Sequence, residues 1–279
     1  MTCACGSIHK HSAPVVHGGD EIALGNPLLA LNGRLICKDV AQMLLAVDLL
    51  SEHAALTRAE PGNLRFDVVQ GDDPLIFELR ELYTGKQAFQ AHRARLYDSR
   101  WGRESHGIAR EFTREQVLPR IRAEMRHDHE AIAELLTMAF DGPDEARLVD
   151  MLRRDGHLAL SLVAEAAGTI LGHVALSPIA ADFPALALAP VAVHPAMQGR
   201  GIGSALIRAA QQAFADHAIV VLGDPEYYGR FGFAPADLAS PYAGPYLLVT
   251  GCAGLPSGSR VAHAPASSMG ISAMRLPPE

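Results

Sequence analysis

The hydrophobic pattern of the first half of the chain predicts an alternation of strands and helices. An apolar run predicts a strand over Leu28–Cys37, and apolar positions at helical spacing predict a helix over Val40–Arg58. Those helical positions are Val40, Leu44, Val47 and Leu50. The next elements are expected as strands at Leu64–Gln70 and Leu75–Leu82 and as a helix at Lys86–Leu96. Strand, helix, strand, strand, helix and strand over roughly 85 residues predict a ferredoxin-like α+β sandwich.

The pattern then restarts with a second series of elements. Strands are expected at Arg120–Met125, Leu158–Ala166, Thr169–Ser177, Ala187–Val193 and Ala218–Leu222. Helices are expected at Asp128–Phe140, Asp144–Arg154 and Gly201–Ala215. Strand, turn, helix and strand in this order predict an α/β unit with a site at the carboxyl end of a strand.

Length and composition agree with two globular domains. The 279 residues exceed one ordinary core and suit two, at roughly 100–200 residues per domain. Hydrophobic residues make up 49% and charged residues 20%, which is typical of globular chains and excludes a fibrous or fully disordered one. We expect a disordered arm over residues 1–27, a first domain over 28–114 and a second over 117–279.

The arm carries cysteines and histidines but no hydrophobic period. These residues are Cys3, Cys5, His9, His11 and His17. Thiolate and imidazole ligands suit zinc or copper, but this spacing fits no zinc template. We therefore expect the arm to be an incidental tail and the protein to hold no metal.

The net charge of the chain bears on which classes of partner it can bind. A formal net charge of −7 argues against general binding of nucleic acid or membrane surfaces, which require a positive field. The sequence has no uninterrupted apolar run of about 18 residues, so we expect no membrane span. The 4 cysteines are too scattered for a disulfide framework, which favours a reduced, cytoplasmic compartment.

A glycine-rich turn between a predicted strand and a predicted helix is the clearest candidate site. It contains Gln198, Gly199, Arg200, Gly201 and Gly203. Glycines let the backbone approach a ligand, and the first N–H groups of a helix are unpaired. With the helix dipole they form a receptor for phosphate groups, to which an arginine adds positive charge. The spacing fits neither the Gly-x-Gly-x-x-Gly dinucleotide fingerprint nor the P-loop, which needs a lysine.

The segment Gln198-Gly-Arg-Gly-Ile-Gly203, after a Val-x-Val-x-Pro strand, resembles the acetyl-CoA motif of the GNAT superfamily of N-acetyltransferases. The segment Leu222-Gly-Asp-Pro-Glu-Tyr-Tyr-Gly-Arg-Phe-Gly-Phe233 is similar to the family's segment after the fifth strand. Its sequence pattern is similar to that of the YhbS-like branch of the family. The resemblance covers about Leu118 to Leu276 and implies a mixed central sheet flanked by helices.

The resemblance also implies roles for individual residues. Tyr228 matches the family's tyrosine and would protonate the departing CoA thiolate as general acid. Backbone groups of the strand residues Val191, Ala192 and Val193 would hold the pantetheine arm of acetyl-CoA. The pyrophosphate would be bound by Gln198, Gly199, Arg200, Gly201, Ile202, Gly203 and Ser204.

The general base is left open by the sequence. His194 lies close to the loop, but a histidine before proline can also be only a turn residue. The strand before the loop contains no acid, and an ordered water is an equal alternative. The other side chains considered are His173, Asp182, Glu165 and Asp224.

The first domain resembles the antibiotic biosynthesis monooxygenase (ABM) family, including quinol monooxygenases, over about Leu28 to Phe112. The segments that carry this resemblance are His53 to Phe66, Phe77 to Tyr83, Ala88 to His92 and Ser99 to Trp101. It implies a dimer-forming ferredoxin-like domain whose active members oxidise phenols with O2 and without metal or flavin.

Within this domain, His53 and His92 are the candidate catalytic residues, with Trp101 beside them. The structural alternatives are a helix-surface or dimer-interface residue for His92 and a core or interface filler for Trp101. Arg58 and Glu60 flank a turn, where we expect them to form an ion pair.

Together these features predict a two-domain acetyltransferase that acts on an unidentified small-molecule or peptide amine and forms a homodimer through the first domain. One alternative is a quinol or phenol monooxygenase in which the second half is a CoA-binding regulator. Another is that the first half serves only for assembly.

Overall fold

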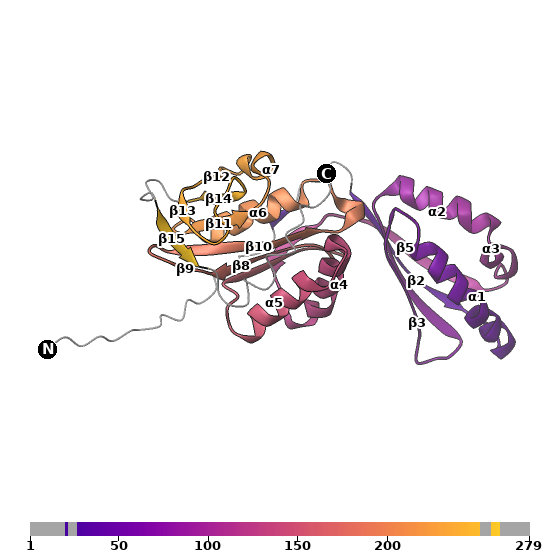
Figure 1. The fold of residues 1–279 in the computed structure, drawn as a ribbon. Helices are drawn as coiled ribbons and strands as arrows, with labels where there is room; N and C mark the ends of the chain where they lie inside the picture. The colour runs from indigo at the N-terminus through magenta and orange to yellow at the C-terminus, as the bar shows by residue number, and fades with distance from the viewer. Residues whose placement is uncertain (1–19, 22–26, 252–257, 263–279) are drawn as a thin grey trace.

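The computed structural model describes residues 20–21, 27–251 and 258–262, which form two units of sheet and helix side by side (Figure 1). The Cys/His segment of the arm lies outside the described residues. Within residues 1–27, strand β1 (Asp20–Glu21) is described, and it pairs antiparallel with β6 (Arg120–Ala123). At these two residues the expected disordered arm is instead a sheet edge. No helix among the described residues is long and apolar enough to cross a membrane.

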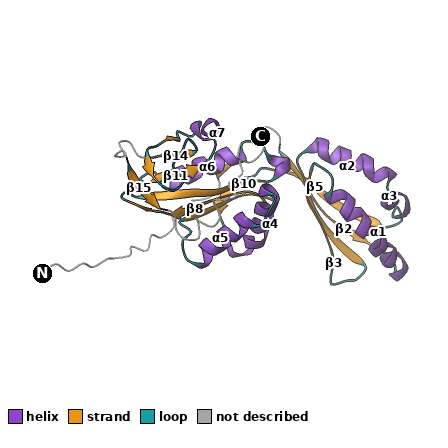
Figure 2. Ribbon diagram, viewed as in Figure 1, coloured by secondary structure: helices purple, strands orange, loops and turns teal. Residues whose placement is uncertain are grey.

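The first unit is a four-stranded antiparallel sheet in the order β3-β4-β2-β5. Its elements are β2 (Leu28–Ile36), α1 (Val40–Arg58), β3 (Asn63–Gln70), β4 (Ile76–Tyr83), α2 (Lys86–Asp98), α3 (Arg100–Glu104) and β5 (Ala109–Val117). The helices cover one face of the sheet (Figure 2). The predicted ferredoxin-like sandwich is confirmed, with α3 as an addition.

The core face of α1 differs from the apolar positions on which its prediction rested. Val40, Leu44 and Val47 are 61%, 60% and 49% exposed. The buried positions are Ala46, Leu49, Leu50, His53, Ala54 and Thr57. Of the four apolar positions, only Leu50 is buried, because the sheet side of this helix is made of small residues, two leucines and a histidine.

The second unit is an eight-stranded mixed sheet in the order β1-β6-β7-β8-β10-β11-β14-β12, in which β10 and β11 are parallel. Its helices are α4 (His129–Phe140), α5 (Asp144–Arg154), α6 (Ile202–Ala213) and α7 (Pro225–Gly229). Its further strands are β7 (Leu160–Ala166), β8 (Thr169–Pro178), β10 (Ala185–Val193), β11 (Ala218–Leu222), β12 (Ala234–Pro235) and β14 (Leu247–Thr250). A small sheet contains β9 (Ala180–Ala181), β13 (Leu238–Ala239) and β15 (Ser259–Ala262).

Helices cover both faces of this mixed sheet, as predicted. Leu206 and Ile207 of α6 pack with Val174 in one apolar cluster. Ile132 and Leu136 of α4 pack in another cluster, and α4 and α5 lie across the sheet from α6 (Figure 1).

The two units share part of their core. Leu28, Ala30 and Leu82 of the first sheet belong to the same buried apolar cluster as Ile121 and Leu160 of the second. Arg65 Nη1 also donates a hydrogen bond of 2.9 Å to the carbonyl of Ala167, in the turn between β7 and β8. The first unit is therefore packed against the second.

Candidate functional site

The parallel strands β10 and β11 separate partway along their length. Their pairing covers Ala185–Ala187 on β10 and Ala218–Val220 on β11. β10 continues to Val193, with a bulge against β8 between Leu188 and Val191. Within the described sheet, the β11-facing main-chain groups of this segment, which includes Val191, Ala192 and Val193, have no ladder partner. Backbone N–H and C=O groups of this kind can hydrogen-bond an extended ligand.

The loop after β10 requires glycine because of its backbone conformation. Gly199 and Gly201 have φ of 72° and 86°, in the left-handed region, while a Cβ on either would meet nothing within 4 Å. Gly201 is the N-cap of α6 and has no side-chain cap, and Ala205 N–H donates to its carbonyl at 3.0 Å. The earlier N–H groups of the first turn, from Ile202 to Ser204, have no acceptor within the helix. Open N–H groups at a helix start of this kind can bind an anion.

Arg200 makes a contact that the sequence did not predict. Its Nη1 donates a 2.9 Å hydrogen bond to the main-chain carbonyl of Thr84, in the first domain. The sequence predicted for this guanidinium only a contribution of positive charge to a phosphate site. Here it also ties the loop to the neighbouring domain.

Tyr228 lies on α7, next to the end of β11. The side chain of Asp224 caps this helix by accepting from Glu226 N–H at 2.9 Å. The Tyr228 ring lies against Gly223, where a Cβ would be 2.2 Å from a ring carbon, and 5.5 Å from the ring of Phe233. Burial raises the pKa of Tyr228. Its hydroxyl therefore keeps its proton at neutral pH, as a general acid must.

The neighbouring Tyr227 lies closer to the glycine loop than the sequence suggested. A Cβ on Gly203 would be 3.0 Å from the Tyr227 hydroxyl oxygen, so this tyrosine borders the first turn of α6. The guanidinium of Arg230 lies 4.4 Å from the centre of its ring. The motif contained two adjacent tyrosines, and family resemblance selected only Tyr228.

His194 lies directly after β10 and caps the short turn that follows. Its Nδ1 accepts from Ala196 N–H at 3.2 Å, and burial lowers the pKa of its imidazole. The ring is therefore neutral, with its proton on Nε2. In this tautomer Nε2 donates a hydrogen bond and cannot take a proton.

A partly buried network of hydrogen bonds joins Glu124, Ser161 and His173. Ser161 Oγ donates to Glu124 Oε2 at 2.6 Å and lies 2.9 Å from His173 Nε2. Arg153 holds Glu124 through two bonds of 2.9 Å. Because Ser161 gives its proton to the carboxylate, His173 must donate from Nε2. This leaves His173 Nδ1 as a buried nitrogen without a partner among the described residues.

The three acids considered as bases have structural partners. Glu165 is 5% exposed and pairs with Arg120 at 3.0 Å. Asp224 caps α7, and Asp182 Oδ2 accepts from Arg260 N–H at 3.5 Å. None of the three is a free carboxylate.

In the first domain, His53 is enclosed by aromatic rings. It is 4% exposed, stacks on Trp101 at 5.1 Å and meets the edge of Phe66 at 5.2 Å between ring centres. Its Nδ1 has no hydrogen-bond partner in the described part of the chain. Burial lowers the pKa of His53 to about 3, so this ring is neutral.

His92 joins the same cluster from α2, with its ring centre 5.8 Å from that of His53. Its Nδ1 lies 3.0 Å from Glu60 Oε2, and Arg95 binds the same carboxylate. The expected ion pair between Arg58 and Glu60 is therefore wrong. Arg58 instead donates to the Phe66 carbonyl, because the turn directs Glu60 toward α2.

A second buried pair adjoins this cluster. Tyr83 OH donates to Glu81 Oε2 at 2.7 Å, and the Tyr83 ring lies 5.2 Å from that of His92. Burial raises the pKa of Glu81 to about 7. Sequence reasoning missed Glu81. The signal that could have found it is its place in β4, where it continues the buried apolar alternation of Phe77 and Leu79. Within the described ranges, no group of three or more His, Cys, Asp or Glu side chains is placed to hold a metal ion.

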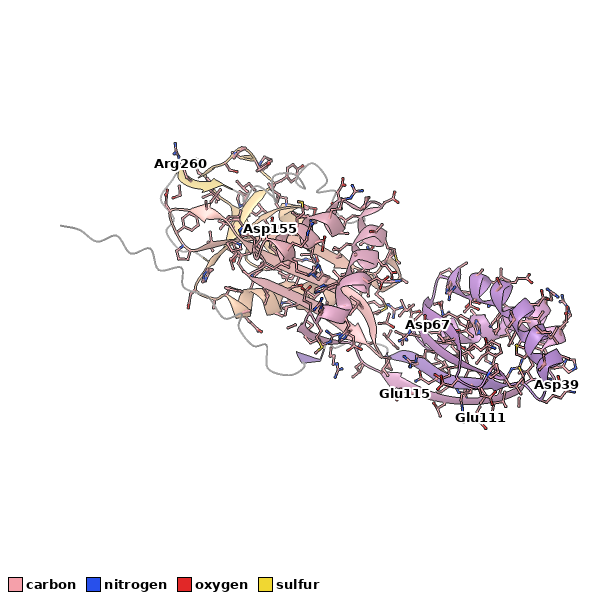
Figure 3. The ribbon with its side chains drawn as sticks, turned by 90° about the horizontal axis from the view of Figure 1, so that it is seen from below. Asp39, Asp67, Glu111, Glu115, Asp155 and Arg260 are labelled. Carbon is pink, nitrogen blue, oxygen red and sulfur yellow. The ribbon has the colours of Figure 1, made fainter. Side chains whose placement is uncertain are left out.

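A cavity of about 460 Å³ lies between the two domains. His194, Thr169 and Glu134 line it on one side and Arg65 and Asp67 on the other. Figure 3 shows Asp67 on the side of the first domain that faces the second. His194 thus opens toward the domain interface.

Comparison with known proteins assigns both halves of the chain. Residues 129–233 match the acetyltransferase (GNAT) family, and residues 41–97 match the antibiotic biosynthesis monooxygenase family. The uncharacterized N-acetyltransferase YhbS of Escherichia coli (strain K12) is 39% identical over 120 residues, which cover 40% of this chain and 72% of that protein. The uncharacterized N-acetyltransferase YjhQ of the same strain is 36% identical over 131 residues, which cover 43% of this chain and 72% of that protein.

The fold comparison agrees with the sequence comparison. The crystal structure of YhbS from Escherichia coli in complex with CoA is similar with a TM-score of 0.51 and 32% identity, covering 54% of this chain and 92% of that one. The family resemblances carried by the two motif sets are thereby confirmed. This chain belongs to the GNAT family of acetyltransferases and carries an ABM domain ahead of its acetyltransferase domain.

Proposed function

We propose that this chain transfers the acetyl group of acetyl-CoA to an amine of an acceptor molecule. The observation that carries the proposal is the open first turn of α6, which the glycine loop joins to β10, a strand with unpaired outer main-chain groups. The first feature fits a pyrophosphate and the second fits the amide groups of pantetheine. The related YhbS structure, which holds CoA, supports this assignment.

Tyr228 supplies the proton that the leaving group needs. The acceptor nitrogen forms a bond to the acetyl carbon, and the bond between that carbon and sulfur breaks. The sulfur leaves as a thiolate and takes the phenolic proton of Tyr228. The place of Tyr228 on α7, next to the end of β11 and with its ring against Gly223, supports this role.

The proton that the amine loses has two proposed routes. His194 is the side-chain candidate, but its Nδ1 is used by Ala196 N–H in the structure. An ordered water is the route that leaves this cap intact. We favour the water and assign His194 to the cap.

Calorimetric titration with acetyl-CoA is the first test. We expect saturable binding, and no binding below about millimolar concentration would contradict the transferase assignment. A thiol-release assay over amines, aminoacyl compounds and peptide amino termini would then identify the acceptor. The acceptor amine must raise CoA release above the rate with acetyl-CoA alone.

Oxidation of a quinol by O2 in the ABM domain is the second candidate function. The aromatic cluster around His53 favours it, because an apolar site lined by rings suits a phenol and the unpartnered Nδ1 of His53 is a polar group that can orient one. Oxygen uptake with a panel of quinols tests the activity. Substituting glutamine for His53 or for His92 should abolish any uptake, with circular dichroism to verify folding. If oxygen uptake persists in both variants, neither His53 nor His92 is needed for the oxidation.

We also propose a homodimer through the ABM domain. The sheet face opposite the helices carries exposed polar side chains, including Arg34, which pairs with Glu111 at 2.7 Å. Figure 3 shows Glu111 and Glu115 along β5 at the outer edge of this domain. Sedimentation equilibrium should give a dimer that Arg34→Glu weakens and that Arg34→Glu with Glu111→Arg restores. A wild-type monomer would contradict the proposal.

A further inference from the structure

The loop residue Arg200 bridges two segments that lie far apart in the sequence. Its Nη1 donates to the carbonyl of Thr84 at 2.9 Å across 116 sequence positions. Arg200 and Thr84 are both half-buried. A hydrogen bond from a charged donor is stronger than one between neutral groups, and partial burial shields it from water. The position of the loop therefore depends on where the Thr84 carbonyl points.

Thr84 belongs to a corner whose shape depends on glycine. β4 ends at Tyr83, α2 begins at Lys86, and Gly85 between them has φ 151°. Side chains rarely adopt this conformation, although a Cβ on Gly85 would lie no closer than 3.6 Å to its nearest neighbour. Thr84 N–H donates to the Gly62 carbonyl at 2.9 Å, which fixes the other side of the corner.

The interface around this corner is packed. Leu28 and Leu82 of the ABM domain are buried in one apolar cluster with Ile121 and Leu160 of the acetyltransferase domain. The packing prevents the Thr84 carbonyl from moving freely with respect to the loop. The corner thus provides a fixed anchoring point for Arg200.

We propose that the acetyl-CoA site is a two-domain site, in which the ABM domain positions the loop Gln198–Gly203 by holding Arg200. The inference rests on the proposed binding of acetyl-CoA to this loop. With Nη1 bound to Thr84, the Nε and Nη2 hydrogens of Arg200 are available for phosphate oxygens. Thr84 and Gly85 are the positioning residues, and they act on the cofactor through Arg200.

A double-mutant cycle on the full chain tests the proposal. Gly85→Ala should turn the Thr84 carbonyl away and raise the dissociation constant for acetyl-CoA about tenfold, the scale of one hydrogen bond to a charged group. Arg200→Ala should raise it by at least as much. Adding Gly85→Ala to Arg200→Ala should then change it less than about twofold, because the two residues act through the same bond.

Two controls separate this coupling from general damage. Gly71→Ala lies at the other end of β4, where a Cβ would make ordinary contacts, and should leave the affinity unchanged. Arg65→Ala removes a second hydrogen bond between the domains, from Arg65 to the carbonyl of Ala167. This variant should also leave the affinity for acetyl-CoA unchanged. Additive effects of Gly85→Ala and Arg200→Ala, or unchanged affinity in Gly85→Ala, would overturn the inference alone. A wild-type chain that does not bind acetyl-CoA would overturn the proposed function together with this inference.

Hydrogen exchange on the wild-type chain gives a test that does not depend on how Gly85→Ala folds. The amides of Thr84 and Phe89, which donate to the carbonyls of Gly62 and Gly85, report on the corner. Coupling between binding sites is reciprocal, so saturating CoA should slow their exchange several-fold. The amide of Gly71, which donates to Ile76, is the internal reference. Equal exchange at Thr84 and Phe89 with and without CoA would overturn the inference.

Discussion

The two candidate sites of this chain are made from different parts of the polypeptide. The acetyltransferase loop uses main-chain groups: left-handed Gly199 and Gly201, and the uncapped first turn of α6. The ABM cluster uses side chains that five separate elements bring together. These are His53, Phe66, Tyr83, His92 and Trp101.

This difference determines how each site can be disturbed. A main-chain site tolerates changes of side chain except where a residue fixes the backbone, as glycine does at positive φ. A buried side-chain cluster is sensitive to charge, because uncompensated charge in an apolar core is costly. We therefore expect backbone substitutions to weaken the loop and low pH to weaken the cluster.

The largest expected effect is on acetyl transfer in Tyr228→Phe. Loss of one general acid should lower turnover roughly 10- to 10⁴-fold, while the affinity for acetyl-CoA stays close to wild type. Steady-state thiol release and calorimetry measure the two quantities. Tyr227→Phe is the matched control on the adjacent position. A loss of turnover in Tyr227→Phe but not in Tyr228→Phe would transfer the acid role to Tyr227, which borders the loop.

The second effect concerns pH, and it involves a buried histidine in each domain. Burial lowers the pKa of His53 to about 3 and that of His173 to about 4. Below about pH 6.5 the unfolded chain binds a proton at each position, while the folded chain does not. The contribution of each histidine is therefore complete above about pH 6.5 and falls by about 1.4 kcal/mol per pH unit down to the folded pKa. Glu81, whose pKa burial raises to about 7, contributes the opposite slope between about pH 7 and pH 4.5, so each histidine is measured by the change of slope in its own variant.

Urea unfolding between about pH 7.5 and pH 4.5 measures this dependence. The fluorescence of Trp101, the single tryptophan, follows the ABM domain, and circular dichroism follows the whole chain. His53→Phe and His173→Leu should each flatten part of the slope. His127→Asn, at a side chain that is 74% exposed, should leave it unchanged. If the unfolding free energy of both variants depends on pH as strongly as that of the wild type, groups other than these two histidines cause the dependence.

The third effect is on cofactor affinity in Gly201→Ala. Residue 201 must keep a φ of 86°, which costs an alanine about 1–2 kcal/mol, so the dissociation constant for acetyl-CoA should rise about tenfold. Gly142→Ala is a matched control, because a Cβ there also meets nothing within 4 Å but φ is not positive. Equal affinities of the two variants would show that loop conformation does not limit binding.

The same difference explains what could be predicted from the sequence. The loop was predictable because one contiguous segment, Gln198–Gly203, contains both its glycines and its helix start. The hydrogen bond from Arg200 to Thr84 could not be predicted, because no local sequence pattern relates residues that are 116 positions apart. The network of Glu124, Ser161 and His173 was missed for the same reason, since it joins a residue directly after β6 to β7 and β8.

Helix α1 shows a second limit of sequence reasoning. Its bounds, Val40–Arg58, were predicted as observed from the spacing of apolar positions, and the structure shows Asp39 as its cap. Of its four predicted apolar positions only Leu50 is buried, because apolar residues occupy more than one side of the helix and only packing selects among them. The selected side brings His53 against Trp101, which is what forms the cluster.

The smallest expected effect is in His194→Asn. Asparagine can also accept the hydrogen bond from Ala196 N–H at a cap, so the turn before the loop should be preserved. If His194 is only a cap, as its tautomer indicates, turnover and affinity for acetyl-CoA should stay within about twofold of wild type. His194→Leu removes the acceptor and should weaken cofactor binding without a specific loss of turnover. A drop of about 10² in turnover for both variants would instead make His194 the base, and the acetyltransferase site would then depend on a side chain as the ABM cluster does.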